Sequence, residues 1–242
     1  MPKIVVLTGA GVSAESGLAT FRDSGGLWEG YDIEEVASIQ GWRRDKKKVL
    51  NFYNLRREQS AKAQPNQAHK AIVNLEEHFD VTVITQNVDD LHERAGSRNV
   101  IHLHGLLKQA KSEINDDIII DIGAKPINVG DKAPDGSQLR PNIVWFGEPV
   151  PMIEIAAEEV ESADILIVVG TSLVVYPAAG LINYSKQHIL KYIVDPSTPD
   201  LFSFEGWGHI KKKASIGMPE LTNILINQNQ LIKKQIAKRK KL

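Results

Sequence analysis

The chain of 242 residues contains no cysteine. That absence excludes disulfide bonds, thiolate metal ligands and a cysteine nucleophile. The chain also lacks an excess of either charge, because 29 basic and 30 acidic side chains leave a formal net charge of −1. Bulk charge therefore gives no reason to expect a polyanionic partner, and we predict no binding to nucleic acid.

Long apolar runs are missing as well. No stretch approaches the roughly 20 apolar residues that a membrane-spanning helix needs. The apolar opening at residues 1–7 is too short for the apolar region and cleavage site of a secretory signal. We therefore expect a cytoplasmic location and no association with a membrane.

Strand and helix patterns alternate through most of the sequence. One helix is predicted after Asn66, where apolar residues recur at helical spacing, and another over residues 150–160. The expected strands are continuous apolar runs, which is typical of strands covered on both faces by helices. We therefore predict an α/β fold with a Rossmann-like, doubly wound parallel sheet. The predicted strands are residues 4–8, 81–85, 100–103, 143–146, 165–169 and 189–194.

Two segments interrupt this alternation. Residues 23–64 contain a helix-like run without a strong strand, and residues 106–141 are polar and turn-rich around one apolar run. A long irregular stretch inside a compact domain indicates a separate module or a functional loop. We predict a Rossmann-like domain and a smaller inserted lobe. The domain would comprise residues 1–22, 65–105 and 142–242, and the lobe residues 23–64 and 106–141.

Four stretches rich in glycine and polar residues each follow a predicted strand. They are residues 9–13, 86–89, 104–105 and 170–172. In an open parallel sheet, the carboxyl ends of the strands form the ligand crevice. The four stretches are therefore expected to face one site.

The first two stretches each have a functional and a structural interpretation. Gly9 and Gly11 can bring backbone N–H groups close to a phosphate at the start of a helix, or they can be simple turn residues. Gln86, Asn87 and Asp89 offer donors and acceptors to ribose hydroxyls or to a carboxamide. Alternatively, the last two of these residues cap the next helix.

A histidine stands at the crevice end of another predicted strand. His104 can act there as a general base, although a lone histidine is more often structural. Alternation puts His102 on the same face of the strand but further from the crevice. His102 therefore serves as an internal comparison for His104.

Five motifs follow one another along the chain: GAGVSAESGLATFR, TQNVDDLHERAG, HLHG, IVWFGEPVP and VVGTSLVVYPAAG. Their sequences and their order resemble the sirtuin family of NAD-dependent protein lysine deacylases, over residues 4–219. The resemblance implies an enzyme that uses NAD to remove acyl groups from the lysine side chains of proteins. The expected products are nicotinamide and O-acyl-ADP-ribose.

The resemblance also implies roles for individual residues. His104 would be the general base, and Asn87 is a second predicted catalytic residue. Phe146, Gly147 and Glu148 would line the acyl-lysine channel and pair with the peptide backbone. NAD would be bound by Gly9, Ala10, Gly11, Glu15, Phe21, Arg22, Gln86, Asn87, Asp89, Gly170, Thr171, Ser172, Asp195 and Ala214.

Tyr53 and Arg56 predict which acyl group is accepted. They are three residues apart and hence neighbours on one helical face. In the sirtuin branch that removes acidic acyl groups, class III, a Tyr-x-x-Arg pair at this point faces the acyl carboxylate, which suits the planar guanidinium. The alternative is an amphipathic surface helix with Arg56 in an ordinary salt bridge. Given the resemblance, we predict that succinyl and malonyl groups are preferred over acetyl.

The chain departs from the family pattern at the zinc site. Most sirtuins carry two cysteine pairs after the catalytic His-Gly, and this chain has no cysteine. We therefore expect no zinc. In its place, apolar packing of Ile118, Ile119, Ile120 and Ile122 is predicted to hold the small lobe. The sequence indicates no particular oligomeric state.

Two alternatives to deacylation share the same motifs. Cleavage of NAD also fits an ADP-ribosyltransferase or an NAD glycohydrolase. The missing zinc site fits a non-catalytic NAD-binding module. Retention of His104 and of the acyl-lysine segment favours deacylation over both.

Overall fold

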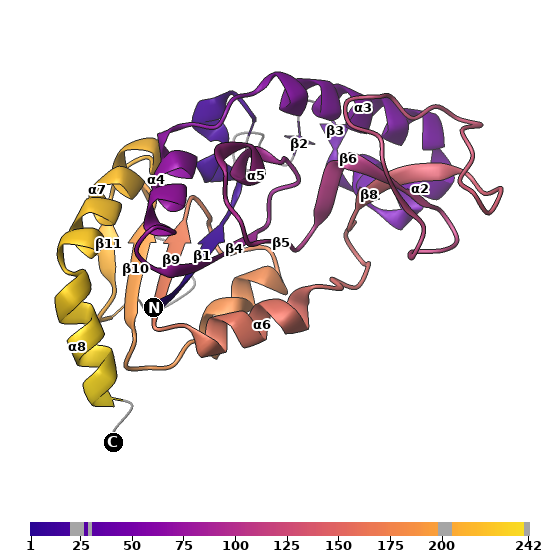
Figure 1. The fold of residues 1–242 in the computed structure, drawn as a ribbon. Coiled ribbons are helices and arrows are strands. Elements are labelled where there is room, and N and C mark those ends of the chain that lie inside the picture. The colour runs from indigo at the N-terminus through magenta and orange to yellow at the C-terminus, as the bar shows by residue number, and fades with distance from the viewer. Residues whose placement is uncertain (20–26, 29–30, 198–204, 240–242) are drawn as a thin grey trace.

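The structure is a computed structural model that describes residues 1–19, 27–28, 31–197 and 205–239. Its main sheet has six strands, every neighbouring pair parallel, in the order β11-β10-β9-β1-β4-β5 (Figure 1). The predicted α/β fold with a doubly wound parallel sheet is confirmed. The strands are β1 (Lys3–Thr8), β4 (Asp80–Thr85), β5 (Val100–His102), β9 (Ile165–Val169), β10 (Leu190–Val194) and β11 (Gly208–Ile210).

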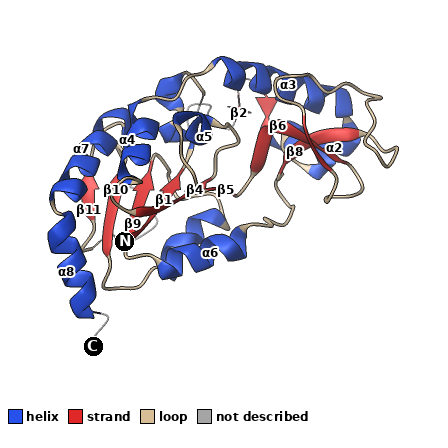
Figure 2. Ribbon diagram, viewed as in Figure 1, coloured by secondary structure: helices blue, strands red, loops and turns tan. Residues whose placement is uncertain are grey.

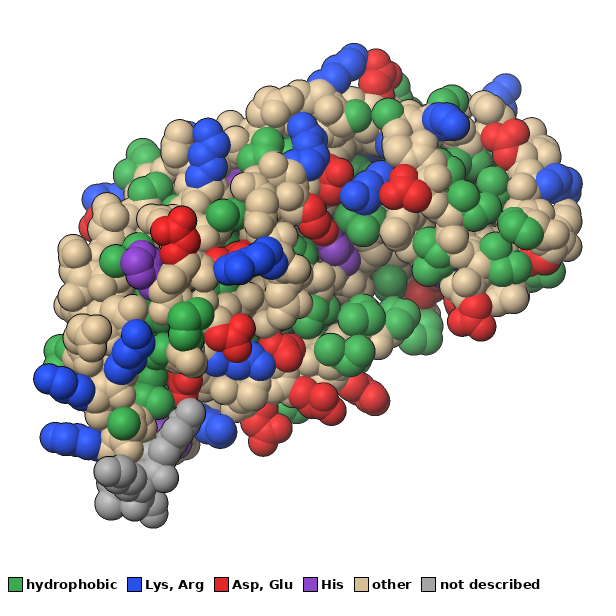
Figure 3. Space-filling view, in the orientation of Figure 1, with side chains coloured by type: hydrophobic (Ala, Val, Ile, Leu, Met, Phe, Trp, Pro, Cys, Tyr) green, Lys and Arg blue, Asp and Glu red, His purple; other side chains and the backbone are tan. Residues whose placement is uncertain are grey.

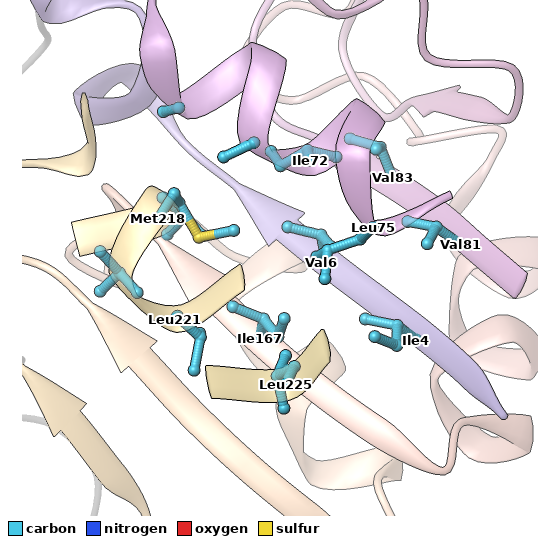
Figure 4. Packing of buried hydrophobic residues seen from close by; sticks show 14 of the residues in the cluster. Ile4, Val6, Ile72, Leu75, Val81, Val83, Ile167, Met218, Leu221 and Leu225 are labelled. Atoms are coloured by element: carbon cyan, nitrogen blue, oxygen red, sulfur yellow. The ribbon is translucent and has the colours of Figure 1, made fainter. Parts of the chain in front are cut away.

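The main sheet is covered by helices on both faces (Figure 2). Side chains alternate along β1, so that Ile4 and Val6 belong to one apolar cluster and Val5 and Leu7 to the other. Helices α4 and α7 pack on the first cluster, where Figure 4 shows their side chains meeting those of β1 and β9. The helices around the sheet are α4 (Gln67–Leu75), α5 (Leu91–Ala95), α6 (Ile153–Ser162), η4 (Ala178–Tyr184), α7 (Ala214–Asn227) and α8 (Asn229–Arg239).

The predicted helix after Asn66 is confirmed as α4. The Asn66 side chain accepts a hydrogen bond from the backbone N–H of Ala68 at 2.8 Å, which caps the helix. Its amide also donates to the carbonyl of Val12 at 2.8 Å. The same side chain therefore starts α4 and fixes the loop that follows β1.

The order of the strands places a crevice beside β1. From β1 the chain moves to β4 and β5 on one side, and it later returns to β9, β10 and β11 on the other side. The switch point lies between β1 and β9, where loops leave the sheet in opposite directions. The loops at residues 9–13 and 170–172 therefore flank the expected binding crevice.

A second group of elements lies to the right of the main sheet in Figure 1. Their buried side chains form a separate apolar cluster that includes Trp42, Phe52 and Leu107. Ile143 and Trp145 also belong to this cluster, although the predicted lobe ends at residue 141. The lobe boundaries stay a prediction. The elements are α1 (Ile33–Val36), α2 (Ile39–Arg44), α3 (Lys46–Lys62), the antiparallel pair β2 (Leu27–Trp28) and β3 (Tyr31–Asp32), and the antiparallel sheet of β6 (Gly105–Ser112), β7 (Ile119–Asp121) and β8 (Leu139–Ile143).

One predicted strand of the main sheet is wrong. Residues 143–146 were expected as a buried strand, but β8 ends at Ile143 and pairs with β6 instead. The run is apolar for a different reason. Ile143 and Trp145 fill the lobe's apolar cluster, whereas Phe146 is half-exposed.

Of the four isoleucines predicted to hold the small lobe, Ile119 does not pack into it, because its side chain is 50% exposed. Ile122 alone of the predicted set packs at the edge of the apolar cluster. Hydrogen bonds of the Ser112 side chain join the end of β6 to the turn at residues 114–115 and to Asp135. The buried Ser112 hydroxyl donates to Asp135 Oδ2 at 2.6 Å. It also accepts from the backbone N–H groups of Ile114 and Asn115 at 3.1 and 3.0 Å.

Acidic and basic side chains are interspersed over the face of the molecule that Figure 3 shows. Within the described part of the chain, no helix combines the length and apolar character that crossing a bilayer requires. The predicted absence of nucleic-acid and membrane partners remains a prediction.

Candidate functional site

A cavity of about 710 Å³ opens at the carboxyl ends of the main-sheet strands. This volume lies within the range of small-molecule and cofactor sites. The cavity walls include residues that follow five adjacent strands of the sheet. In strand order, these residues are Asp195 after β10, Gly170 after β9, Gly9 after β1, Gln86 after β4 and His104 after β5.

Glycines bring the loops after β1 and β9 into contact. A Cβ atom added at Gly9 would lie 2.7 Å from Thr171 Cβ, and one at Gly11 would lie 2.7 Å from Gly170 Cα. The N–H groups of these two glycines donate to the carbonyls of Val169 and Gly170 at 3.0 and 2.8 Å. Glycine is therefore required because two backbones approach closely at the switch point.

The sequence left two interpretations of Gly9 and Gly11, as residues beside a phosphate at the start of a helix or as simple turn residues. The segment after β1 forms two single turns, η1 (Ala10–Val12) and η2 (Ala14–Ser16), in place of a long helix. Both glycine N–H groups donate to backbone acceptors. The role of these glycines in binding NAD stays a prediction.

Glu15 connects this loop to the C-terminal part of the fold. Its carboxylate accepts a hydrogen bond from the backbone N–H of Ser215 at 3.0 Å, in the first turn of α7. A carboxylate there is favoured by the unpaired N–H groups of the helix start. Ala214, the first residue of α7, also lines the cavity. The loop after β1 and the start of α7 therefore form one wall.

Polar side chains after β4 bind the other loops around the cavity. Gln86 Nε2 donates to Thr171 Oγ1 at 3.1 Å, and Asn87 Nδ2 donates to Ser13 Oγ at 3.0 Å. Asp89 Oδ1 accepts from the backbone N–H of Leu91 at 3.1 Å. The N-cap residue of α5 is Asp90, so neither Asn87 nor Asp89 takes the capping position that the alternative predicts. Burial raises the pKa of the Asp89 carboxyl, although its hydrogen bonds oppose that shift.

His104 is held in one tautomer. Its Nδ1 lies 2.9 Å from the carbonyl oxygen of Gln86, which can only accept, so Nδ1 carries the hydrogen. Nε2 is then the unprotonated nitrogen of the neutral ring. Burial lowers the pKa of His104, and the bond to Gln86 opposes this shift more weakly. The imidazole of His104 is therefore neutral at neutral pH, with Nε2 able to accept a proton.

The residue after this histidine shapes the turn. Gly105 has φ +82°, and a Cβ atom there would lie 2.0 Å from the carbonyl oxygen of Asn142. Only glycine fits this position without moving β8. His102, the internal comparison, instead lies 2.6 Å from Glu93 Oε1 and is not among the residues that line the cavity.

The opposite wall of the cavity comes from α3 and from the segment after β8. Tyr53 and Arg56 of α3 are both buried, and both line the cavity. Trp145 lines it too, and its indole Nε1 donates to Tyr53 Oη at 3.0 Å. These two positions of α3 therefore lie on a face of the helix that is not exposed to solvent.

An ion pair supports this wall. Glu148 accepts two hydrogen bonds from the Arg140 guanidinium, at 2.7 and 3.0 Å, and one from the backbone N–H of Trp145 at 2.8 Å. The Arg140 guanidinium carbon lies 3.4 Å from the centre of the Trp145 ring. Arg140 thus contacts both the carboxylate and the aromatic ring.

The cavity brings together every predicted site residue that the structure describes. Phe21 and Arg22 lie outside the described residues. Sequence reasoning missed Ser13 and Trp145, although both stand inside quoted motifs. It also missed Arg140, for which no local signal exists because its partners follow five and eight residues later. The predicted residues that line the cavity are Gly9, Ala10, Gly11, Glu15, Tyr53, Arg56, Gln86, Asn87, Asp89, His104, Phe146, Gly147, Glu148, Gly170, Thr171, Ser172, Asp195 and Ala214.

Over residues 1–19, 27–28, 31–197 and 205–239, no group of three or more histidine, aspartate or glutamate side chains could hold a metal ion. The expectation that the protein binds no zinc stays a prediction.

Known proteins match this chain over most of its length. The sequence profile of the Sir2 family matches residues 9–177. A curated relative from Bacteroides thetaiotaomicron is named NAD-dependent protein deacylase. It is 50% identical over 231 residues, which cover 93% of this chain and 99% of the relative.

Solved structures agree with the family match. A complex of a Sir2 homologue with NAD has a TM-score of 0.83 and 43% identity, and the match covers 94% of this chain and 90% of that one. A Sir2 protein with a p53 peptide and NAD⁺ has a TM-score of 0.72 and 29% identity, with coverage of 94% and 93%. Because the profile spans more than half of the chain and the relative covers nearly all of it, this chain belongs to the Sir2 family.

Proposed function

We propose that this protein is an NAD-dependent deacylase of protein lysine side chains that prefers succinyl and malonyl groups over acetyl. Membership of the Sir2 family and the named activity of its relatives make it an NAD-dependent enzyme. The products would be nicotinamide and O-acyl-ADP-ribose. The observation that carries the acyl preference is that Tyr53 and Arg56 line the same cavity as His104.

The sheet side of the cavity fits an elongated dinucleotide. Its wall runs past five adjacent strands, which at about 4.8 Å per strand gives an edge roughly 19 Å long. Amide and hydroxyl groups of Gln86, Asn87 and Ser172 along this edge offer donors and acceptors for ribose and carboxamide groups. NAD, when bound, supplies an ADP-ribose group whose bond to nicotinamide is the one broken.

His104 would move a proton in this reaction. Its Nδ1 hydrogen is committed to the carbonyl of Gln86, which leaves Nε2 to accept a proton from a ribose hydroxyl. Because burial lowers the pKa of His104, the ring is already neutral when substrate binds. The base therefore does not have to lose a proton first.

Tyr53 and Arg56 would select the acyl group. A guanidinium presents paired N–H donors that match the geometry of a carboxylate, and a neutral phenol adds another donor. Ala37, a small buried residue, lines the cavity near them and leaves room for a longer acyl chain. An acetyl group would give these donors no charged partner.

Arg56→Met tests the proposed preference. We expect kcat/KM for a succinyl-lysine peptide to fall roughly a hundredfold, because about 3 kcal/mol is a typical loss when a buried charge pair is broken. The acetyl-lysine rate should change little. Arg43→Met, on the exposed face of α2, is the matched control and should change neither rate.

Mass spectrometry of the products separates the other possible functions. Succinyl-lysine peptide and NAD should give deacylated peptide together with O-succinyl-ADP-ribose. An ADP-ribosyl adduct would indicate a transferase, and free ADP-ribose alone would indicate a glycohydrolase. NAD binding without release of nicotinamide would indicate a non-catalytic module. Any of these last three results would refute the proposal.

A further inference from the structure

The hydrogen bond between Trp145 and Tyr53 has a fixed direction. An indole has one N–H donor and no acceptor, so the phenol oxygen must accept. Both side chains are almost completely buried, with 2% and 1% of their surface exposed. The hydrogen of the Tyr53 hydroxyl therefore points away from Trp145. Within the described chain, no second partner of this hydroxyl is found.

The Tyr53 phenol also stays protonated. Burial raises the pKa of Tyr53 far above its usual value, and the bond from Trp145 and the nearby charge of Arg56 offset only part of that shift. At neutral pH the group is therefore a donor O–H beside the guanidinium of Arg56. Both groups offer hydrogen atoms to a ligand in the cavity.

Trp145 cannot easily turn away from Tyr53. Arg140 covers its ring at 3.4 Å, and the Trp42 ring lies 5.6 Å from it on a tilted plane. Glu148 binds the Trp145 backbone N–H and both terminal nitrogens of Arg140. The carboxylate thus fixes the backbone of Trp145 and the cation that covers its ring at the same time.

We propose that Trp145, held by Arg140 and Glu148, is a positioning residue for acyl selection. By occupying the acceptor side of the Tyr53 oxygen, its indole N–H directs the phenol hydrogen toward the acyl group. This inference rests on the proposed preference for acidic acyl groups. It adds Trp145, a residue outside the Tyr-x-x-Arg pair, which orients the hydroxyl hydrogen of Tyr53.

This arrangement favours a carboxylate in two ways. The carboxylate of succinyl-lysine can accept the phenol hydrogen together with hydrogen atoms of Arg56. The methyl group of acetyl-lysine accepts nothing, and the phenol cannot compensate by turning toward Trp145, which offers only a donor. A buried donor without an acceptor is unfavourable, so acetyl-lysine binds less well.

The test compares acyl preference in four proteins: wild type, Trp145→Phe, Tyr53→Phe and the double variant. The measured quantity is the ratio of kcat/KM for succinyl-lysine to that for acetyl-lysine, on one peptide sequence. We expect Trp145→Phe to lower this ratio about tenfold, mainly through a higher KM for the succinyl peptide. In the Tyr53→Phe background, the same substitution should have no further effect, because Trp145 acts through the Tyr53 hydroxyl.

Trp42→Phe is the matched control. It removes another indole N–H from the same aromatic group, but this one donates to Glu113 at 3.2 Å. Phenylalanine at position 42 keeps an aromatic ring against Trp145, so the ratio should stay unchanged. If Trp145→Phe does not fold, the sulfur analogue of tryptophan, 3-benzothienylalanine, takes its place at position 145. It keeps the shape of the two rings and removes only the N–H donor.

The outcomes separate this inference from the proposed function. A wild-type protein that prefers succinyl-lysine, and keeps the full preference after Trp145→Phe or the analogue, overturns the inference alone. An equal loss in the Tyr53→Phe background also overturns it, because Trp145 would then act independently of the hydroxyl. A wild-type protein without acidic preference overturns the proposed preference and the inference together.

Discussion

The two walls of the cavity are built by different means. The wall on the main sheet consists of loops at the ends of parallel strands, whose apolar side chains are buried on both faces. The opposite wall carries Tyr53, Arg56 and Trp145, and it is supported by the ion pair of Arg140 and Glu148. The first wall thus presents backbone groups of the loops and the proposed base His104. The second wall presents hydrogen-bond donors to the acyl group.

This difference separates chemistry from specificity. Residues of the sheet wall are expected to act on every acyl substrate, because each substrate uses the same NAD and the same base. Residues of the lobe wall are expected to change only which acyl group is accepted. Substitutions on the two walls should therefore give different patterns of loss.

The largest expected effect is on the sheet wall. His104→Ala should lower deacylation of acetyl and succinyl peptides alike by about 10²- to 10⁴-fold, the typical contribution of a general base. NAD affinity, measured by calorimetry, should stay nearly unchanged. Undiminished turnover in this variant, or a loss confined to succinyl peptides, would contradict the assignment of the base.

The next effect concerns stability on the sheet side. His69 is fully buried in α4, and burial lowers its pKa to about 4. Between pH 6.5 and 4 the unfolded chain therefore binds more protons there, so stability falls as the pH falls. From pH 7.5 to 4.5 this one group should account for about 2.5 kcal/mol of lost unfolding free energy.

Urea unfolding at the two pH values measures this loss. His69→Gln should remove most of it, because glutamine suits the third helical position of a capping box but does not titrate. His188→Gln, at an exposed histidine, is the control and should leave the pH dependence unchanged. An unchanged pH dependence in His69→Gln would show that other groups dominate.

The smallest of these effects tests how the lobe side is held. Ser112→Ala should lower the unfolding free energy by about 1 kcal/mol, because the exposed Asp135 and two backbone N–H groups lose a hydrogen-bond partner but can be rehydrated. Ile119→Ala should cost less than about 0.5 kcal/mol, since this side chain is half-exposed. Both losses can be measured by thermal unfolding. A larger loss for Ile119→Ala than for Ser112→Ala would support the predicted role of the isoleucines in holding the lobe.

The sequence predicted the main sheet well and the lobe sheet poorly, for a physical reason. Residues 165–169 are all aliphatic because helices cover both faces of β9, so the pattern was visible. Strand β6, by contrast, reads GLLKQAKS and contains no β-branched residue. It forms a strand because β7 and β8 pair with its two edges, which no local pattern reveals.

The sequence predicted site residues well where they come shortly after strands of the main sheet. It predicted them less well where residues far apart in the sequence contact one another. Gln86 and His104 follow strands directly, and the strand order alone brings them to one edge. The contacts among Tyr53, Arg140 and Trp145 join α3 to β8 and the segment after it. Such contacts depend on how the lobe packs, so only the structure identifies Trp145 as a partner of Tyr53.

One panel of rates tests the proposed acyl preference. Acetyl, malonyl, succinyl and glutaryl groups on the same lysine peptide would be compared with the wild-type protein and NAD, following nicotinamide and O-acyl-ADP-ribose. We predict that kcat/KM for the succinyl and malonyl peptides exceeds that for the acetyl peptide by more than about tenfold, as expected for a buried donor pair facing a carboxylate. Equal values for acetyl and succinyl peptides would contradict it.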